Sequence, residues 1–434
     1  MSTNDTEFNE YHSDSSYTLI LHPHLKNIRD HDEISHDPLA RLEEAKGLAR
    51  AIKLDVRYGE VIPLRKAHAG SLFGKGTVER IKGIIEHEKV SLVVIDSSVS
   101  PIQQRNLEKA WNCKVIDRTG LILAIFGERA KTSEGRLQVE LASLMYQKSR
   151  LVRSWTHLER QRGGLGTVGG PGETQIEVDR RLIGSRISKL KVDIEAIKKT
   201  RQVQRKSRKK TPYPVVALVG YTNAGKSTLF NKLTNATVIA KDILFATLDP
   251  TMRSLKLPSG RTVIMSDTVG FISDLPTQLV AAFRATLEEV LEADLLLHVR
   301  DISHEQTATQ AADVYKVLKK LGIDKELSEH IIEVHNKIDL LNPDHIVTKS
   351  DAVEVSALTG MGLNKLQTTI DEFLAQNENI VNVMVPCDNG KAIAWIHSHG
   401  EVIEHKIDDD FNYITARMSA ENLDRFKKLF PDVK

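Results

Sequence analysis

Cysteine is nearly absent from this chain, and long apolar runs are absent as well. The 434 residues include only Cys113 and Cys387, too few for a disulfide framework or a cysteine-based zinc site. No apolar run approaches the roughly 20 residues of a membrane-spanning helix, and the first residues lack the basic-then-apolar order of a signal peptide. We therefore expect a cytoplasmic protein without stable membrane insertion, whose two thiols are reduced.

A large net charge is also lacking, although the charge is unevenly spread. The formal net charge is +2, with 27% charged and 41% hydrophobic residues, a composition typical of globular domains. The length predicts two to four domains, each able to bury its own core. Acidic residues are missing from residues 198–210, where every charged side chain is basic.

A glycine-rich stretch in the middle of the chain carries the strongest functional pattern. Residues 216–219 predict a buried strand, residues 220–227 fit G-x-x-x-x-G-K-[ST], and a helix is expected from Lys226. Glycines let backbone N–H groups surround a triphosphate, Lys226 reaches its β- and γ-phosphates, and Ser227 supplies an oxygen to Mg²⁺. The residues expected to form this nucleotide site are Gly220, Tyr221, Thr222, Asn223, Ala224, Gly225, Lys226, Ser227 and Thr228.

Two further stretches follow in the order that a guanine-nucleotide switch needs. Thr247 is placed to bind Mg²⁺ and sense the γ-phosphate, with Thr251 as the alternative. After a strand predicted at 262–265, Asp267 reaches Mg²⁺ through water and Gly270 offers its N–H to the γ-phosphate. The expected nucleotide contacts here are Phe245, Ala246, Thr247, Asp267, Thr268, Val269 and Gly270. Those expected to serve hydrolysis are Lys226, Thr247 and Gly270, and those expected to bind the metal are Ser227 and Thr247.

Asn336-Lys-Ile-Asp339, after a strand predicted at 331–335, indicates which base is bound. The Asp339 carboxylate accepts hydrogen bonds only from a base with N–H donors on its edge, as guanine has and adenine lacks. An unpaired buried carboxylate would penalise adenine by several kcal/mol. The residues expected near the base are Asn336, Lys337, Asp339, Ser356, Ala357 and Leu358.

The N-terminal part alternates strand and helix patterns. Residues 1–17 are polar and predict a disordered tail, whereas residues 18–132 predict a small parallel α/β domain. Its strands are expected at 18–21, 54–58 and 91–96, and its helices at 38–52, 77–89 and 101–111. Residues 70–77 either bind an anion at a helix start or form a plain helix entry.

Five histidines lie in the first 36 residues. They are His12, His22, His24, His31 and His36. Their irregular spacing and the lack of nearby cysteines argue against a metal site, so we expect solvated side chains.

Two heptad-like stripes predict an antiparallel helical hairpin over residues 133–211. The apolar residues are Leu137, Leu141, Leu144, Leu151, Trp155 and Leu158, then Ile183, Ile187, Leu190, Ile194 and Ile197. The glycine-rich tip is flanked by arginines, which bind phosphates bidentately. Those expected to contact RNA are Arg153, Arg160, Arg162, Arg180 and Arg181. The hairpin either presents this tip and residues 198–210 to nucleic-acid phosphates or only spaces two domains.

Residues 212–378 are the predicted G domain, and residues 379–434 predict a small α+β domain. Its strands are expected at 380–386, 402–407 and 413–418, and its helices at 391–400 and 422–430. This last domain either touches RNA or a ribosomal protein or caps the GTPase core. The predicted fold is α/β: a P-loop G domain with an N-terminal parallel α/β domain, an antiparallel helical hairpin and a small α+β C-terminal domain.

From about residue 18 to the end of the predicted G domain, the sequence resembles the bacterial GTPase HflX family. The resemblance rests on Asp117-Arg-Thr-Gly-Leu-Ile, Glu134-Gly-Arg-Leu-Gln-Val-Glu-Leu-Ala142, Trp155-Thr-His-Leu-Glu-Arg-Gln161, Gly169-Gly-Pro-Gly-Glu-Thr-Gln175 and Val219-Gly-Tyr-Thr-Asn-Ala-Gly-Lys-Ser-Thr-Leu-Phe-Asn231. It implies a GTPase that hydrolyses GTP to GDP and phosphate, binds the large ribosomal subunit and its rRNA, and splits stalled or idle ribosomes when loaded with GTP. It also implies that the hairpin tip approaches the peptidyl-transferase centre.

Phe271 stands where many regulatory GTPases carry a water-orienting glutamine. Because phenylalanine cannot hold a water by hydrogen bonding, we expect slow intrinsic hydrolysis that a partner such as the ribosome stimulates. Asn223 adds a second hypothesis, since similar loops in some GTPases use this asparagine to hold K⁺ in place of an arginine finger.

Three functions remain open from the sequence. One is ribosome splitting, the second is assembly of immature large subunits with the same domains, and the third is a low-turnover switch that binds a protein partner. In each case we expect a monomer that binds GTP and GDP with Mg²⁺ and, under the Asn223 hypothesis, K⁺.

Overall fold

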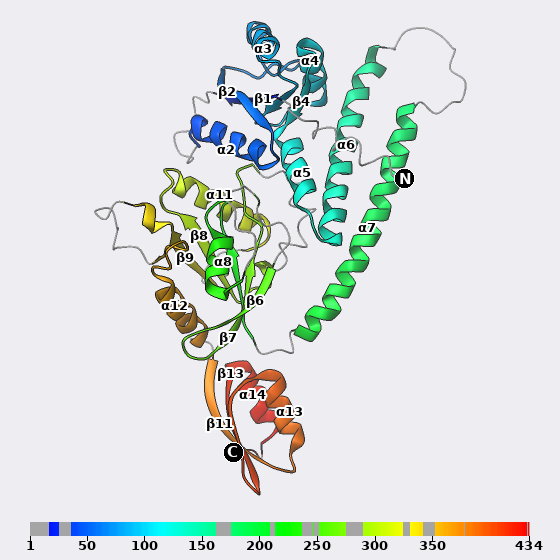
Figure 1. Cartoon of the computed structure of the whole chain (residues 1–434). Coiled ribbons are helices and arrows are strands. Elements are labelled where there is room, and N and C mark those ends of the chain that lie inside the picture. The colour runs from blue at the N-terminus through cyan, green and yellow to red at the C-terminus, as the bar shows by residue number, and fades with distance from the viewer. Residues whose placement is uncertain are drawn as a thin grey trace.

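The computed structural model describes residues 17–25, 36–161, 175–208, 213–236, 245, 251–274, 290–323, 330–341, 352–376, 378–431 and 433. Three sheets follow one another along the chain, and two long helices lie between the first and second sheets in sequence. Figure 1 shows the N-terminal sheet at one end, the second sheet in the middle and the C-terminal sheet at the other end. The fold is therefore α/β with separate layered units, as the sequence predicts.

Four parallel strands form the N-terminal sheet in the order β2-β1-β3-β4. They are β1 (Tyr17–Leu25), β2 (Asp55–Leu64), β3 (Leu92–Ile95) and β4 (Lys114–Asp117). The helices of this unit are α2 (Pro38–Ala51), α3 (Lys75–Glu88), α4 (Pro101–Trp111) and α5 (Arg118–Arg129). The predicted strands and helices are confirmed in type and place. Neither β4 nor α5 was predicted from the sequence, since β4 has only four residues and α5 follows it directly at Arg118 with no turn between them.

Capping side chains explain where several of these helices begin. The Asp37 carboxylate accepts the N–H of Ala40 at 2.9 Å, and Ser100 and Gln103 form a reciprocal capping box before α4. Because the strands are parallel, the polar residues at the carboxyl ends of β1, β3 and β4 gather at one edge of the sheet.

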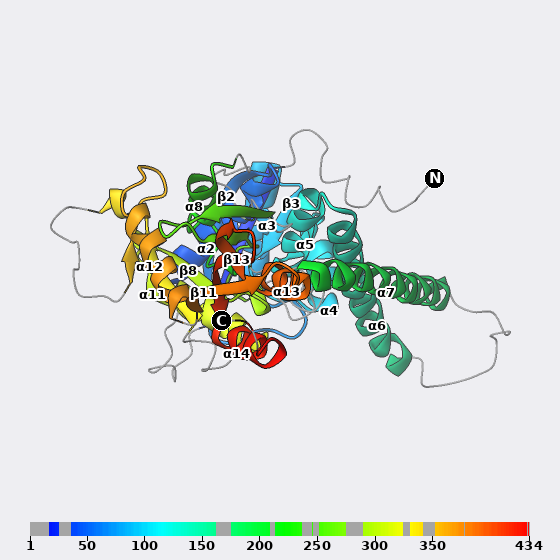
Figure 2. The same ribbon diagram turned by 90° about the horizontal axis from the view of Figure 1, so that it is seen from below.

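The two long helices, α6 (Ser133–Gln161) and α7 (Gln175–Arg208), lie side by side as a hairpin (Figures 1 and 2). Their seam consists of Leu141, Leu144, Ile187, Leu190 and Ile194, with Leu137, Met145 and Ile183 packed against it. The predicted heptad stripes therefore face each other in this part of the pair. The side chains of Trp155 and Leu158 lie outside the described residues.

The second sheet has six strands in the order β10-β9-β8-β5-β7-β6, parallel except for β6 at one edge. The strands are β5 (Val215–Val219), β6 (Thr251–Lys256), β7 (Thr262–Asp267), β8 (Leu295–Asp301), β9 (Ile331–Asn336) and β10 (Val353–Glu354). The helical elements are α8 (Lys226–Thr234), α11 (Thr307–Lys320), the short η3 (Ile338–Leu340) and α12 (Leu363–Ala375). Strand β5 lies inside the sheet between β8 and β7, and residues 216–219 at its carboxyl end are buried.

The C-terminal sheet is antiparallel, in the order β11-β13-β12. Its elements are β11 (Glu378–Pro386), α13 (Gly390–His399), β12 (Glu401–Ile407), β13 (Phe411–Ser419) and α14 (Ala420–Leu429). The predicted order of strands and helices is confirmed. A contact between this unit and the second sheet is the Glu401 carboxylate, which accepts the Thr262 N–H at 3.1 Å. No helix in the described parts of the chain is both long and apolar enough to cross a membrane.

The expectation of solvated histidines is wrong for His22 and His36. His22 is 7% exposed, and its Nδ1 lies 2.8 Å from Asp96 Oδ2. His36 lies with Nε2 2.7 Å from Asp313 Oδ2 and Nδ1 3.2 Å from Gln306 Oε1. Both acidic partners come from distant parts of the chain, so local spacing could not reveal them. His12 and His31 lie outside the described residues.

Candidate nucleotide-binding site

The glycine loop follows β5 and enters α8 at Lys226, as predicted. Gly220 has φ +151°, and a Cβ built there would lie 2.2 Å from the Val299 carbonyl oxygen. Gly225 has φ +92°, and its Cβ would lie 2.2 Å from Asn336 Nδ2. Both positions therefore require glycine, for backbone conformation and for space.

Asn336 joins three of the predicted motifs. Its Nδ2 donates to the Ala224 carbonyl at 2.9 Å, and its Oδ1 accepts the Ala357 N–H at 2.9 Å. Asn336 itself is 1% exposed. The sequence placed this residue near the base, but it did not show that the amide fixes the glycine loop and the 356–358 segment together.

Lys226 is buried where the loop meets the helix. Its Nζ donates to the carbonyls of Gly220 at 3.2 Å and Tyr221 at 2.7 Å. Burial lowers the pKa of Lys226 to about 8, and the charge of Asp267 offsets only part of that effect. A phosphate beside this amine would raise the pKa again, because an adjacent anion favours the charged form.

Two of the oxygen atoms expected near Mg²⁺, those of Ser227 and Asp267, lie together. Ser227 Oγ is 2.7 Å from Asp267 Oδ2 at the end of β7. A hydroxyl and a carboxylate are the oxygen donors that Mg²⁺ prefers, so this pair fits the ion. Thr247 lies outside the described residues together with Ala246, and Phe245 is buried against Phe126 with ring centroids 4.7 Å apart. Thr251 begins β6 opposite Asp267.

Gly270 lies directly against the glycine loop. A Cβ built at Gly270 would be 2.9 Å from both Lys226 Nζ and Thr222 Cγ2. The next residue, Phe271, donates its N–H to the Gly220 carbonyl at 3.1 Å, and its carbonyl accepts the Thr222 N–H at 2.7 Å. The Phe271 ring belongs to the apolar core. The segment after Gly270 is thus paired with the loop through its backbone, and its aromatic side chain points away from solvent.

Between Asp267 and Gly270 the chain is also buried. Thr268 Oγ1 donates to the Leu218 carbonyl at 2.5 Å, and Val269 packs in the core. In the loop itself, Asn223 is exposed with φ +61°, a left-handed conformation that asparagine adopts more readily than most residues. Thr228 follows Ser227 in the first turn of α8.

The other residues expected near the base follow strands β9 and β10. Asp339 is exposed in η3, and Lys337 Nζ lies 2.8 Å from Asp301 Oδ2. Leu358 is 73% exposed, and buried Ser356 accepts the Thr359 N–H at 3.1 Å. Asp301 was not predicted from the sequence, although its position at the end of β8 was the available signal.

The arginines expected to contact RNA are only partly described. Arg180 and Arg181 are exposed near the start of α7. The side chains of Arg153 and Arg160, and the whole of Arg162, lie outside the described residues. Among the side chains that the structure does describe, no group of three or more His, Cys, Asp or Glu is arranged for a metal ion.

Comparisons with known proteins match all of the units that carry this site. Family models described as GTP-binding GTPase N-terminal, GTP-binding GTPase Middle Region and 50S ribosome-binding GTPase match residues 40–127, 129–208 and 215–337. The protein named GTPase HflX of Magnetococcus marinus is 48% identical over 400 residues, which are 91% of this chain and 92% of the relative. GTPase HflX of Escherichia coli is 45% identical over 337 residues, which are 75% of this chain and 78% of the relative.

A similar solved structure is that of a GTP-binding protein from the archaeon Sulfolobus solfataricus in complex with GDP. The similarity covers 83% of this chain and 99% of that chain, with 23% identity and a TM-score of 0.44.

Proposed function

The chain belongs to the HflX family of GTPases, and from this premise we propose that it binds the large ribosomal subunit when loaded with GTP and separates stalled or idle ribosomes. The protein binds guanine nucleotides and hydrolyses GTP to GDP and phosphate. Separation of ribosomal subunits would place it in the cytoplasm, where ribosomes are found.

The observation that carries the proposal is the long helical pair beside the G domain. Helices α6 and α7 have 29 and 34 residues, which at about 1.5 Å per residue gives lengths of roughly 43 and 51 Å. Figure 2 shows both helices projecting beyond the sheets. Exposed Arg180 and Arg181 lie in the first turns of α7, which follows the glycine-rich residues in the sequence. Such a projection would carry basic side chains into rRNA while the G domain remains outside.

Within the G domain we assign roles to the motif residues. Lys226 holds the β- and γ-phosphates, Gly270 donates its N–H to the γ-phosphate, and Asp339 accepts the N–H donors of guanine. Ser227 and Thr247 would hold Mg²⁺, with Asp267 acting through water. The ion, when bound, neutralises charge on the β- and γ-phosphate oxygens.

Hydrolysis by the isolated protein should be slow. The buried ring of Phe271 leaves no side chain at that position to orient the attacking water. We assign stimulation to the ribosome, and we assign a K⁺ site to the exposed Asn223. If Na⁺ in place of K⁺ supports equal ribosome-stimulated hydrolysis, the K⁺ assignment fails.

Sedimentation of ribosomes tests the main proposal. Intact ribosomes are mixed with protein loaded with a non-hydrolysable GTP analogue, with GDP or with no nucleotide, and separated on sucrose gradients. We expect the triphosphate form to bind the large subunit and to convert intact ribosomes into subunits. Equal binding in all three states would reject the proposal.

The same gradients separate the remaining candidates. Accumulation on immature large subunits without splitting would instead support an assembly GTPase. The double variant Arg180→Gln/Arg181→Gln should convert fewer intact ribosomes into subunits. Its matched control is Arg57→Gln, because Arg57 is an exposed arginine on β2 that pairs with Asp55.

A further inference from the structure

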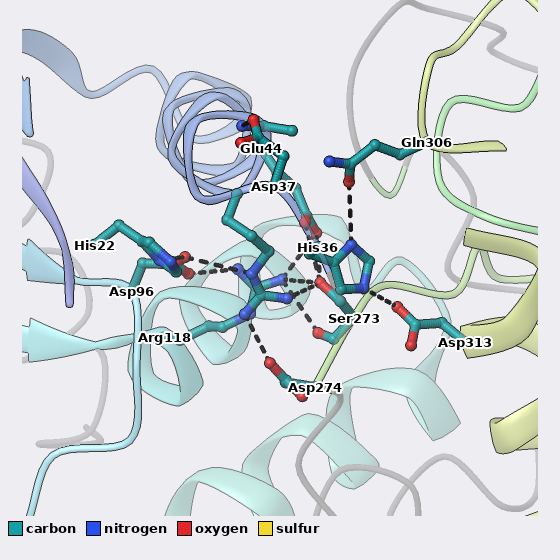
Figure 3. A network of polar contacts seen from close by, with 12 residues as sticks. His22, His36, Asp37, Glu44, Asp96, Arg118, Ser273, Asp274, Gln306 and Asp313 are labelled. Carbon is teal, nitrogen blue, oxygen red and sulfur yellow. Dashed lines mark hydrogen bonds and ion pairs between the residues drawn. The ribbon is translucent and has the colours of Figure 1, made fainter. Parts of the chain in front are cut away.

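A buried polar cluster joins the N-terminal sheet unit to the G domain (Figure 3). The N-terminal side supplies Arg41 and Glu44 from α2 and Arg118 from the start of α5. The G-domain side supplies Ser273, which is 1% exposed and lies three residues after Gly270. We call Arg41, Glu44, Arg118 and Ser273 the interdomain cluster.

Ser273 is bonded through both its backbone and its hydroxyl. Arg118 Nη2 donates to the Ser273 carbonyl at 3.1 Å and to its Oγ at 3.2 Å. The Ser273 hydroxyl donates to Glu44 Oε2 at 3.0 Å, and Arg41 Nη1 donates to the same hydroxyl. Arg41 Nη2 also donates to Asp274 Oδ2 at 2.7 Å. Side chains of the N-terminal unit therefore fix this short segment of the G domain.

Tyr221 ties the same cluster to the glycine loop. Its hydroxyl accepts the Ser273 N–H at 2.8 Å and donates to Glu44 Oε1 at 3.1 Å. Burial, and then the Glu44 carboxylate, raise the pKa of Tyr221 far above its usual range, so the phenol keeps the proton that it donates. The hydroxyl thus links a residue of the loop, a residue after Gly270 and a residue of α2.

The two arginines are themselves held by Asp96 at the end of β3. Arg118 Nη1 contacts Asp96 Oδ1, Arg118 Nη2 lies 2.8 Å from Glu44, and His22 lies 2.8 Å from Asp96. Burial would raise the pKa of Asp96, but Arg118, His22 and Arg41 together hold it well below its usual range. These ion pairs hold both arginines in place at the interface.

The position of Gly270 gives this cluster a consequence for nucleotide binding. Gly270 and Lys226, the two groups assigned to the γ-phosphate, are neighbours, since a Cβ built at Gly270 would lie 2.9 Å from Lys226 Nζ. Phe271 is paired with the loop on one side, and Ser273 is held by the cluster on the other. A segment bound at both places loses little freedom when the γ-phosphate arrives, so less of the binding energy is spent on ordering it.

We propose that Tyr221, Glu44, Arg41 and Arg118 are positioning residues that hold Gly270 ready for the γ-phosphate and so set the preference for GTP over GDP. The N-terminal unit would thereby help the G domain to discriminate GTP from GDP. This inference rests on the assignment of Gly270 made above, and it does not depend on the ribosome. GDP has no γ-phosphate, so its affinity should not depend on the cluster.

An ordinary interface would behave differently. Weakening a contact that only holds two units together lowers stability and leaves the ratio of GTP to GDP affinity unchanged. A cluster that holds Gly270 in an inhibited position would give a third result, in which GTP affinity and intrinsic hydrolysis rise when the cluster is weakened.

The test uses the full chain without ribosomes and the variant Tyr221→Phe, which removes one hydroxyl and keeps the ring. Dissociation constants for a non-hydrolysable GTP analogue and for GDP are measured by calorimetry, with single-turnover GTP hydrolysis beside them. We expect the analogue to bind about five- to tenfold more weakly, the effect of about one lost hydrogen bond. The analogue should therefore lose more affinity than GDP, and hydrolysis at saturating GTP should slow.

Arg41→Gln should have the same effect, and Arg41→Lys should recover part of it because lysine restores the charge. The matched control is Arg80→Gln, an arginine of α3 that is paired with Glu60 at the surface of the same unit. An unchanged analogue-to-GDP ratio in Tyr221→Phe and Arg41→Gln overturns the proposal, and so does tighter analogue binding.

Gly270→Ala separates this proposal from the assignment on which it rests. A Cβ at Gly270 would also press on Lys226, which serves the β-phosphate of both nucleotides, so the analogue is compared with GDP. If Gly270→Ala weakens the analogue much more than GDP and Tyr221→Phe does not, the assignment of Gly270 holds and the positioning role fails. If Gly270→Ala leaves analogue affinity unchanged, the assignment fails and the positioning role fails with it.

Discussion

The N-terminal sheet and the G-domain sheet are both largely parallel, and both collect polar residues at the carboxyl ends of their strands. In the N-terminal sheet these residues are charged side chains that pair with one another, such as Asp96 with Arg118. In the G domain they surround a glycine loop whose backbone N–H groups and Lys226 are suited to a phosphate. The same sheet architecture therefore serves once as a charge-paired docking surface and once as a ligand site.

The difference lies in how each basic residue is balanced. Arg118 pairs with carboxylates of the protein, whereas within the described parts of the chain Lys226 donates to two backbone carbonyls and has a lowered pKa. An arginine paired with carboxylates of the protein stabilises the folded state. A lysine that pairs with a phosphate raises the affinity for the nucleotide. Substitutions in the two sheets should therefore change different measured quantities.

Arg118→Met should give the largest effect, on stability. It removes the cation between Asp96 and Glu44, so the buried Asp96 carboxylate keeps His22 and Arg41 but loses its shortest ion pair, and breaking such a buried pair costs about 3 to 5 kcal/mol. Chemical denaturation of the nucleotide-free protein measures this loss. Equal stability of Arg118→Met and the unaltered protein would contradict the role given to the pair, and Arg80→Gln is the control for removing a surface arginine.

At Lys226, burial of the amine should make the unfolding free energy depend on pH. Its folded-state pKa, about 8, lies below the usual value of 10.5, so the unfolded chain binds more protons between these values. The unfolding free energy of the nucleotide-free protein should therefore rise as pH increases through this window, by at most about 3 kcal/mol. Denaturation at several pH values measures the slope, and Lys226→Met should lack this contribution. Identical slopes for the two proteins would show that Lys226 is not buried as a charged amine.

Lys226→Ala should reduce nucleotide affinity with little loss of stability. Loss of the charged hydrogen bonds to phosphate should cost about 2 to 3 kcal/mol, or roughly 30- to 150-fold in affinity for GTP. Calorimetric titration measures it, with Lys232→Ala on the exposed side of α8 as control. Wild-type GTP affinity in Lys226→Ala would remove this residue from the site.

Asp339→Asn should have the smallest of these effects, on base selection. The amide loses one acceptor for the guanine N–H donors, so GTP affinity should fall by about 1 to 2 kcal/mol while ATP affinity changes little. Competition between GTP and ATP measures the selectivity, and Asp388→Asn at an exposed C-terminal position is the control. Selectivity equal to that of the unaltered protein would rule out the assignment of Asp339.

The prediction from sequence succeeded where one local stretch determines the structure. The glycine loop, its strand and its helix follow from adjacent residues, since Gly220 and Gly225 meet backbone requirements that few other residues satisfy. The helical pair also follows from a repeat within each helix. By contrast, His22 was misassigned because its partner, Asp96, is 74 residues away in the sequence.

By itself, the sequence determined the order of the units, the nucleotide motif and the family, because each depends on residues close together in the chain. Only the tertiary structure decided that Arg118 and Glu44 contact Ser273, which lies 155 and 229 residues away from them. The reason is that burial and pairing are properties of the packed chain. A charged residue looks the same in the sequence whether water, a ligand or another domain balances its charge.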